Sequence, residues 1–350
     1  MARLVAAAGI SHSPLLAAPA ELWLERGRED RRNPELRDHT GRLASFEQLE
    51  RGARGMFDRE IDQELIEQRA KLCQQSLDRV QDDLASADID VVIVIGDDQR
   101  ELFDGSNSPA LSVYVGDEIQ MMRAPNSDST SGSFWSSVWK GYGMDPPRQF
   151  PAARPEALEL CRSLVGAGFD LAVSESPSGL GFGHAIGFPL VRLDASCRWR
   201  TLPVLINTYY PPNQPTPERC YELGQAIRAA IGSLPDSLRV GILASGGLSH
   251  FVINERLDME VLAALHSRDR DRLTRIATRL LDSGSSEIRN WIALGGAMAD
   301  DTPAWSEYVP CYRSEAGTGC GMGFISWTDI NEAAVRDHAG PGARDTRDVA

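Results

Sequence analysis

The chain alternates short, almost purely apolar runs with longer segments whose apolar residues recur at helical spacing. Residues 91–95 are five consecutive β-branched residues closed by Gly96, which predicts a strand buried on both faces. Residues 57–85 predict a long helix with one apolar face, because apolar residues lie four, seven or eight positions apart: Ile61, Leu65, Leu72, Val80 and Leu84.

The same two patterns recur along the rest of the chain. Further strands are predicted at 4–10, 110–115, 170–173, 202–206 and 240–243, and further helices at 154–165, 218–231 and 258–281. Buried strands that alternate with amphipathic helices predict an α/β fold with a central, mostly buried sheet flanked by helices. Residues 20–55 are charged and irregular, and residues 331–350 are typical of a flexible C-terminal tail.

Composition and charge narrow the class of protein. The net charge is -14, which argues against a nucleic-acid or anionic-membrane surface. No apolar run approaches the roughly 20 residues that span a bilayer. The six cysteines are scattered without a CxxC pair, which indicates reduced thiols. We therefore expect a cytoplasmic protein that binds neither nucleic acid nor membrane.

Polar clusters follow three of the predicted strands. The first contains His12, the second ends in Gln99 with Glu101 close behind, and the third runs through His250 to Glu255. Ligands of α/β sheets gather at the carboxyl ends of strands. Two histidines and a carboxylate there are the ingredients of a non-haem iron site.

Ordinary structural roles also account for these residues. His12 is equally compatible with a core or helix-capping histidine, and Asp97 and Asp98 with a pair of helix caps. Glycines flank His184, which allows a backbone to approach a ligand closely, so this imidazole could act as an acid or base or simply lie in a loop. Phe134, Trp135, Trp139 and Tyr142 lie among Ser and Gly and predict either a cover or a surface loop.

Together these segments resemble the class III (LigB-type) extradiol ring-cleavage dioxygenases, the superfamily of the protocatechuate 4,5-dioxygenase catalytic subunit. The resemblance runs from about residue 4 to 328, and residues 96–99 and 207–217 are similar to the gallate and methylgallate branch. The matching segments are 10–14, 183–184 with 189–190, 245–250 with Glu255 and Asp258, and 295–298.

The resemblance implies one domain over residues 1–330 and an Fe(II) centre that acts with O2 on a small catechol- or gallate-like aromatic diol. It implies that His12 and Glu255 are metal ligands. It implies that His184 accepts a proton from the substrate and later assists O–O cleavage. It also implies that His250 lines the pocket. Since relatives are commonly dimers, it also implies a homo-oligomer.

One departure from the family pattern concerns the second ligand histidine. Gln99 stands at the aligned position, and an amide oxygen binds iron less well than an imidazole does. The other candidates for completing the metal shell are Asp97, Asp98, Glu101 and, if residues 20–55 fold over the site, His39.

The leading hypothesis is therefore an Fe(II)-dependent extradiol dioxygenase whose pocket is closed by the aromatic segment 134–142. An arginine such as Arg100 or Arg123 could hold a substrate carboxylate. Two alternatives stay open: a metal-dependent lyase or hydrolase on the same fold, and a non-catalytic binding homologue.

Overall fold

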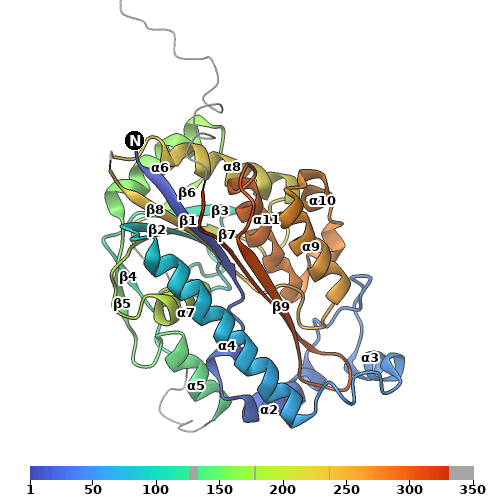
Figure 1. The fold of residues 1–350 in the computed structure, drawn as a ribbon. Helices are drawn as coiled ribbons and strands as arrows, with labels where there is room; N and C mark the ends of the chain where they lie inside the picture. Colours follow the sequence, from blue (N-terminus) through green and yellow to red (C-terminus); the bar gives the residue numbers. More distant parts are fainter. Residues whose placement is uncertain (126–132, 177–178, 236, 331–350) are drawn as a thin grey trace, which may run out of the picture.

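The computed structural model describes residues 1–125, 133–176, 179–235 and 237–330 (Figure 1). Its strands are β1 (Arg3–Ile10), β2 (Val91–Asp97), β3 (Leu111–Tyr114), β4 (Glu118–Gln120), β5 (Gln149–Pro151), β6 (Ala172–Ser174), β7 (Arg200–Ile206), β8 (Arg239–Ser245), β9 (Trp305–Tyr312) and β10 (Gly319–Trp327). The α-helices are α1 (Pro14–Ala17), α2 (Trp23–Glu29), α3 (Phe46–Ala53), α4 (Gln63–Ser86), α5 (Phe134–Gly141), α6 (Arg154–Gly166), α7 (His184–Leu193), α8 (Pro217–Ile231), α9 (Glu255–Ser267), α10 (Arg270–Thr274) and α11 (Ile288–Ala297). Short 3-10 helices are η1 (Ala20–Leu22), η2 (Asp30–Arg32), η4 (Thr278–Leu280) and η5 (Ser283–Glu287).

Eight strands form one sheet in the order β6-β3-β7-β2-β8-β1-β10-β9. The four neighbours β7, β2, β8 and β1 are parallel, whereas β10 and β9 extend the sheet as an antiparallel hairpin beside β1. Because parallel strands end at the same edge, the chain that follows β1, β2 and β8 emerges at one place. This edge of the sheet is where the polar clusters of the sequence meet.

Helices cover both faces of the sheet, and the apolar strands supply both cores. Along β2, Val91, Ile93 and Ile95 pack into one core with α6, α8, α9 and α11. Val92 and Val94 pack into the other core with α1, α4, α5 and α7. Figure 1 shows α4 crossing the face of the sheet opposite to α8 and α11. The predicted α/β fold with a buried central sheet is confirmed.

The predicted strands all occur with small shifts of their ends, but the predicted helix 258–281 is wrong. The chain forms α9, then α10, then η4. Arg268 ends α9 in the left-handed conformation with φ 56°, and Asp269 caps α10 by accepting a hydrogen bond from the Arg272 backbone N–H. A polar turn of this kind interrupts a helix without a glycine or a proline, so apolar periodicity alone misses it.

The long helix α4 is confirmed, but its buried face is displaced from the predicted one. Val80 and Leu84 are buried as predicted, whereas Leu72 is 38% exposed. The buried stripe instead continues through Ile66 and Cys73, each one position further along the chain than Leu65 and Leu72, and through Leu77. The spacing therefore predicted the helix correctly and its rotation only in part.

The observed buried face of α4 predicts that truncation of two of its leucines changes the free energy of unfolding by different amounts. Leu77→Ala should lower the free energy of unfolding by about 2–5 kcal/mol, because Leu77 is fully buried and its truncation leaves a cavity. Leu72→Ala should change it by less than about 0.5 kcal/mol, since Leu72 is exposed on the same helix. Urea unfolding followed by circular dichroism measures both, and equal losses would contradict this rotation of α4.

Residues 20–55 are more regular than predicted, because they contain α2 and α3. Ser45 begins α3 with a capping box, in which its hydroxyl accepts from the Gln48 backbone and Gln48 accepts from the Ser45 backbone. The predicted tail 331–350 lies outside the described residues, as do residues 126–132, which precede the aromatic segment. In the part of the chain that is described, none of the helices has the length and apolar character to cross a bilayer.

Candidate active site

A cavity of about 360 Å³ opens at the carboxyl edge of the parallel strands. Its walls include His12 after β1, Gln99 after β2 and His250 after β8. His184, at the start of α7, and Glu287, directly before α11, complete a group of polar residues from five separate elements. The predicted convergence of the strand-end clusters is therefore present in the fold.

His12 lies between two polar side chains and is hydrogen-bonded to one of them. Its Nδ1 lies 2.9 Å from Ser245 Oγ at the end of β8, and its Nε2 lies 2.9 Å from Glu287 Oε2. Burial lowers the pKa of His12 below its ordinary value, and the charge of Glu287 opposes this only in part. Ser13, not His12, caps α1, so the capping role considered for His12 is taken by its neighbour.

His184 is oriented by a carboxylate behind it. Its Nδ1 lies 2.8 Å from Glu101 Oε1. Burial acts to lower the pKa of His184, but the charge of Glu101 and this hydrogen bond outweigh it and raise the pKa to about 9. Gly183 makes the contact possible, because a Cβ at that position would lie 2.3 Å from Glu101 Oε1. The flanking glycine of the sequence therefore admits a carboxylate beside the histidine.

His250 lies on the other side of Glu287. Its Nδ1 is 2.9 Å from the backbone oxygen of Leu248, so Nδ1–H donates there and Nε2 is left toward Glu287 Oε1, 3.5 Å away. Burial acts to lower the pKa of His250, but the negative charge of Glu287 raises it well above its ordinary value. The Leu248 carbonyl thus fixes the orientation of the His250 ring in the cavity wall.

Gln99 enters the cavity as a hydrogen-bond donor. Its amide nitrogen lies 3.0 Å from Glu287 Oε1 and 3.4 Å from Asp97 Oδ2. The Gly247 backbone N–H also donates to Glu287, at 2.6 Å from Oε2. Burial acts to raise the pKa of Glu287, but His12 and His250 together hold it well below the ordinary value. Glu287 is thus a fixed, ionised carboxylate at the centre of the group.

His12, His184 and Glu287 lie close enough together to hold a divalent metal ion. Each offers one ligand atom, and these atoms all lie within 4.8 Å of one another. His12 Nε2 lies close to Glu287 but is a buried atom without a hydrogen-bond partner among the described residues, as a nitrogen reserved for a metal ion would be. Two imidazoles and one carboxylate form the donor set typical of non-haem Fe(II) oxygenases, so the residues fit such an ion.

The structure does not bring the predicted ligand Glu255 to this group. Glu255 is the exposed first residue of α9, and its Oε1 accepts a hydrogen bond of 2.7 Å from the Tyr312 hydroxyl. The carboxylate beside His12 and His184 therefore belongs to Glu287 and not to Glu255, which the sequence analysis predicted. A signal for it was present, since Glu287 directly precedes the apolar residues of α11, and a helix N-terminus favours a carboxylate.

The other candidates for completing the metal shell have different places. Asp97 is buried, and burial together with the charge of Glu287 raises its pKa well above the ordinary value, so it is a poor ligand in its neutral form. Asp98 accepts from three backbone N–H groups of the loop after β2. No helix begins in this described loop, so the helix-cap role considered for Asp97 and Asp98 is wrong. Glu101 orients His184. His39 is exposed and does not line the cavity.

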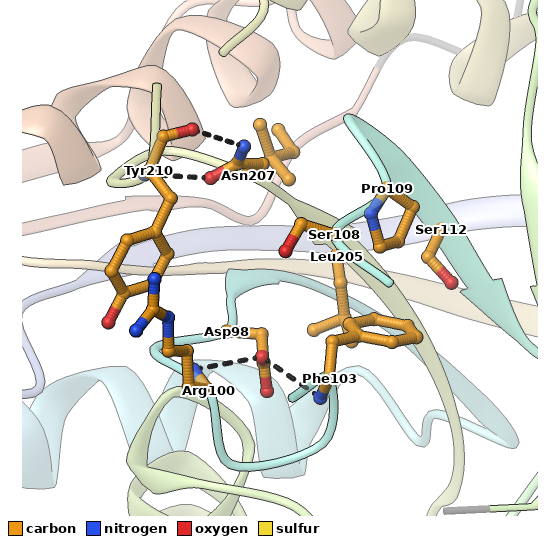
Figure 2. A pocket seen from close by; sticks show the side chains of 10 residues that line it. Asp98, Arg100, Phe103, Ser108, Pro109, Ser112, Leu205, Asn207 and Tyr210 are labelled. Carbon is orange, nitrogen blue, oxygen red and sulfur yellow. Dashed lines mark hydrogen bonds between the residues drawn. The ribbon is translucent and has the colours of Figure 1, made fainter. Parts of the chain in front are cut away.

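Neither arginine named for a substrate carboxylate lines the cavity. Arg100 lines a separate, much smaller pocket of about 20 Å³ (Figure 2). Its guanidinium lies 4.3 Å from the centre of the Tyr210 ring. Asp98 and Asn207 line the same pocket. Arg123 is exposed. A volume of this size holds about one water molecule, so we assign this pocket no substrate.

The aromatic segment forms a wall of the cavity. Trp135 and Trp139 of α5 line it with ring centroids 5.2 Å apart and nearly parallel planes, and Tyr142 follows them. The Tyr142 hydroxyl donates to the backbone oxygen of His12, 3.0 Å away, which ties this segment to the candidate metal site. Of the two interpretations of the segment, the described part therefore favours a cover over an unrelated surface loop.

The fold and the site define a class: an α/β protein with a candidate two-histidine, one-carboxylate metal centre beside a cavity with an aromatic wall. The family described as the catalytic LigB subunit of aromatic ring-opening dioxygenases matches residues 55–322. The chain belongs to this LigB family, as the sequence resemblance indicates.

Two known proteins show similarity over different extents. A gallate dioxygenase of Pseudomonas putida is 31% identical over 168 residues, which cover 44% of this chain and 48% of that protein. The match therefore spans about half the length of this curated relative. A crystal structure of an uncharacterized protein from Escherichia coli K12 aligns with 92% of this chain and 99% of its own, with 13% identity and a TM-score of 0.43.

Proposed function

We propose that the protein is a non-haem Fe(II)-dependent extradiol dioxygenase that cleaves the ring of a small catechol- or gallate-like aromatic compound with O2. The observation that carries the proposal is the convergence of His12, His184 and Glu287 beside the cavity, in a chain of the LigB family. The 31% identical gallate dioxygenase supports a trihydroxylated aromatic acid as the first substrate to try.

In this proposal His12, His184 and Glu287 hold the iron. A metal-binding histidine usually donates its other ring N–H to a fixed partner, and Ser245 behind His12 and Glu101 behind His184 have that position. The contact to Glu101 is our reason for assigning His184 to the metal, where the sequence reading gave it the substrate proton. Gln99 acts through its hydrogen bond to Glu287 and orients that carboxylate.

His250 is then the residue left to take the substrate proton, because Fe(II) held by Glu287 would offset the negative charge that raises the pKa of this histidine. Its Nδ1–H is engaged with Leu248, so a hydroxyl of a diol in the cavity meets Nε2. When bound, Fe(II) supplies the redox chemistry between the electron-rich diol and O2. The carbon–carbon bond next to the diol breaks and both oxygen atoms enter the product, so no external reductant is needed. Trp135 and Trp139 exclude water from the cavity.

Oxygen uptake after anaerobic loading with Fe(II) tests this function. We expect about one iron per chain and O2 consumption with gallate, protocatechuate or catechol, with both atoms of labelled dioxygen found in a ring-opened product by mass spectrometry. Product without O2 consumption would support the lyase or hydrolase instead. Saturable binding of these compounds without any product would support the binding homologue. A chain that binds no iron would contradict the proposal.

We also propose that the protein works in the cytoplasm, as the reduced state of its thiols supports. All six cysteines are free, including Cys73 and Cys311, whose sulfur atoms lie 3.7 Å apart without a disulfide bond. The homo-oligomer implied by the family resemblance stays a prediction.

A further inference from the structure

Two largely buried arginines line the same cavity and have no part in the candidate metal site. Arg26 comes from α2, and Arg313 directly follows β9. Only 14% of the Arg26 side chain and 4% of the Arg313 side chain are exposed. Two guanidinium groups so far removed from water need compensating negative charge, because burial of an unpaired charge is unfavourable.

One buried carboxylate compensates both of them. Arg313 contacts Asp30 in a two-pronged manner, with Nε 2.7 Å from Oδ2 and Nη2 3.0 Å from Oδ1. Arg26 places Nη1 2.9 Å from the same Oδ1. The next acidic group is Glu29, which lies 3.5 Å from Arg26 but is 47% exposed and therefore screened by water. Within this cluster, two guanidinium charges thus share one buried carboxylate.

Arg26 retains capacity for a ligand. In the described part of the chain it donates to Asp30 through Nη1, which leaves the donors on Nε and Nη2 for another partner. Burial, and then the charge of Arg313, lower the pKa of Arg26 below its ordinary value. A bound anion would relieve both effects, because it restores the solvation that the guanidinium lacks.

The surroundings of Arg26 favour an anion attached to an aromatic ring. Its guanidinium carbon lies 5.9 Å from the centre of the Trp135 ring, which stacks on Trp139. Both indoles line the cavity beside Arg26. A flat apolar wall next to a forked cation matches an aromatic carboxylate, whose ring packs on the indoles while its two oxygens accept from the guanidinium.

We propose that Arg26, positioned by Asp30 and Arg313, binds the carboxylate of an aromatic acid and selects carboxylated diols over neutral ones. The inference rests on the proposed function for the identity of the diol. The anion subsite itself depends only on Arg26, Asp30 and Arg313. Arg26 thus has the role of holding the substrate carboxylate, for which the sequence analysis suggested Arg100 or Arg123.

Gallate and pyrogallol form a matched pair of probes, since they differ by the carboxylate alone. In Arg26→Gln we expect kcat/KM for gallate, divided by that for pyrogallol, to fall about 10- to 100-fold, because a charge-assisted hydrogen bond is lost for one substrate only. Arg28→Gln is the control, because Arg28 is exposed on the same helix, and its ratio should match that of the unchanged protein. A ratio that Arg26→Gln leaves unchanged would overturn the subsite.

Calorimetric titration of the metal-free protein separates this inference from the proposed function. Benzoate should bind more tightly than benzamide, and Arg26→Gln should remove most of that difference even if no diol is ever turned over. If the affinity for benzoate stays the same in Arg26→Gln, the anion binds elsewhere and the inference is wrong. Should Arg26→Gln fail to fold, Arg26→Lys keeps a charge without the fork and should reduce benzoate affinity by an intermediate factor; no reduction would again overturn it.

Discussion

Replacement of Glu287 by Gln should abolish metal binding and turnover, whereas replacement of Glu255 by Gln should change neither. Glu287 is buried at the centre of the group, with His12 Nε2 2.9 Å from its Oε2. The substitution removes the single ionised carboxylate of the proposed ligand set. Iron affinity should fall more than about 100-fold, because even residues that only support metal ligands contribute roughly 10- to 100-fold.

Glu255→Gln is the matched control for this experiment. The two variants carry the same chemical change, and Glu255 lies outside the cavity beside Tyr312. Iron content by mass spectrometry, with thermal unfolding to confirm that both variants fold, gives the comparison. Loss of iron in Glu255→Gln with retention in Glu287→Gln would restore the assignment made from the sequence and contradict the structural one.

The fold could be predicted largely because its strands are buried on both faces. Continuous apolar runs such as residues 91–95 leave little ambiguity, and β2 forms where they predict it. The hairpin of β9 and β10 was not predicted from the sequence, because Gly321 and Gly323 interrupt the apolar run in the sequence of β10. The packing of the strand requires these glycines. A Cβ at Gly321 would lie 2.1 Å from Asp258 Oδ2. Such contacts with residues distant in the sequence cannot be seen in a local pattern.

Site residues that directly follow a strand could be predicted from the sequence. Those that only tertiary contacts bring to the site were missed. His12, Gln99 and His250 all line the cavity as expected, because strand ends converge at one edge of the sheet. Glu287 belongs instead to the short segment before α11, and only the packing of that helix brings it to His12. Likewise Arg26 lies in a charged segment whose sequence resembles a solvated loop, yet Asp30 and Arg313 hold it at the cavity.

Replacement of His250 by Ala should lower kcat about 100- to 10,000-fold while iron remains bound, because the loss of a general base removes proton transfer without removing a metal ligand. Replacement of His184 by Ala should instead release the iron. The prediction follows from the ring contacts: His184 is backed by Glu101 as a metal ligand would be, whereas His250 is fixed by the Leu248 carbonyl beside Glu287.

The two histidines are controls for one another, since both line the cavity and both are truncated in the same way. Iron content and kcat are measured for each variant after anaerobic loading. Glu101→Gln provides an independent readout, because weakening the partner of a metal-bound His184 should reduce iron affinity by roughly 10- to 100-fold. If His184→Ala keeps its iron and loses only turnover, His184 is the proton acceptor, as the family resemblance implies, and the third ligand must be sought beside Gln99.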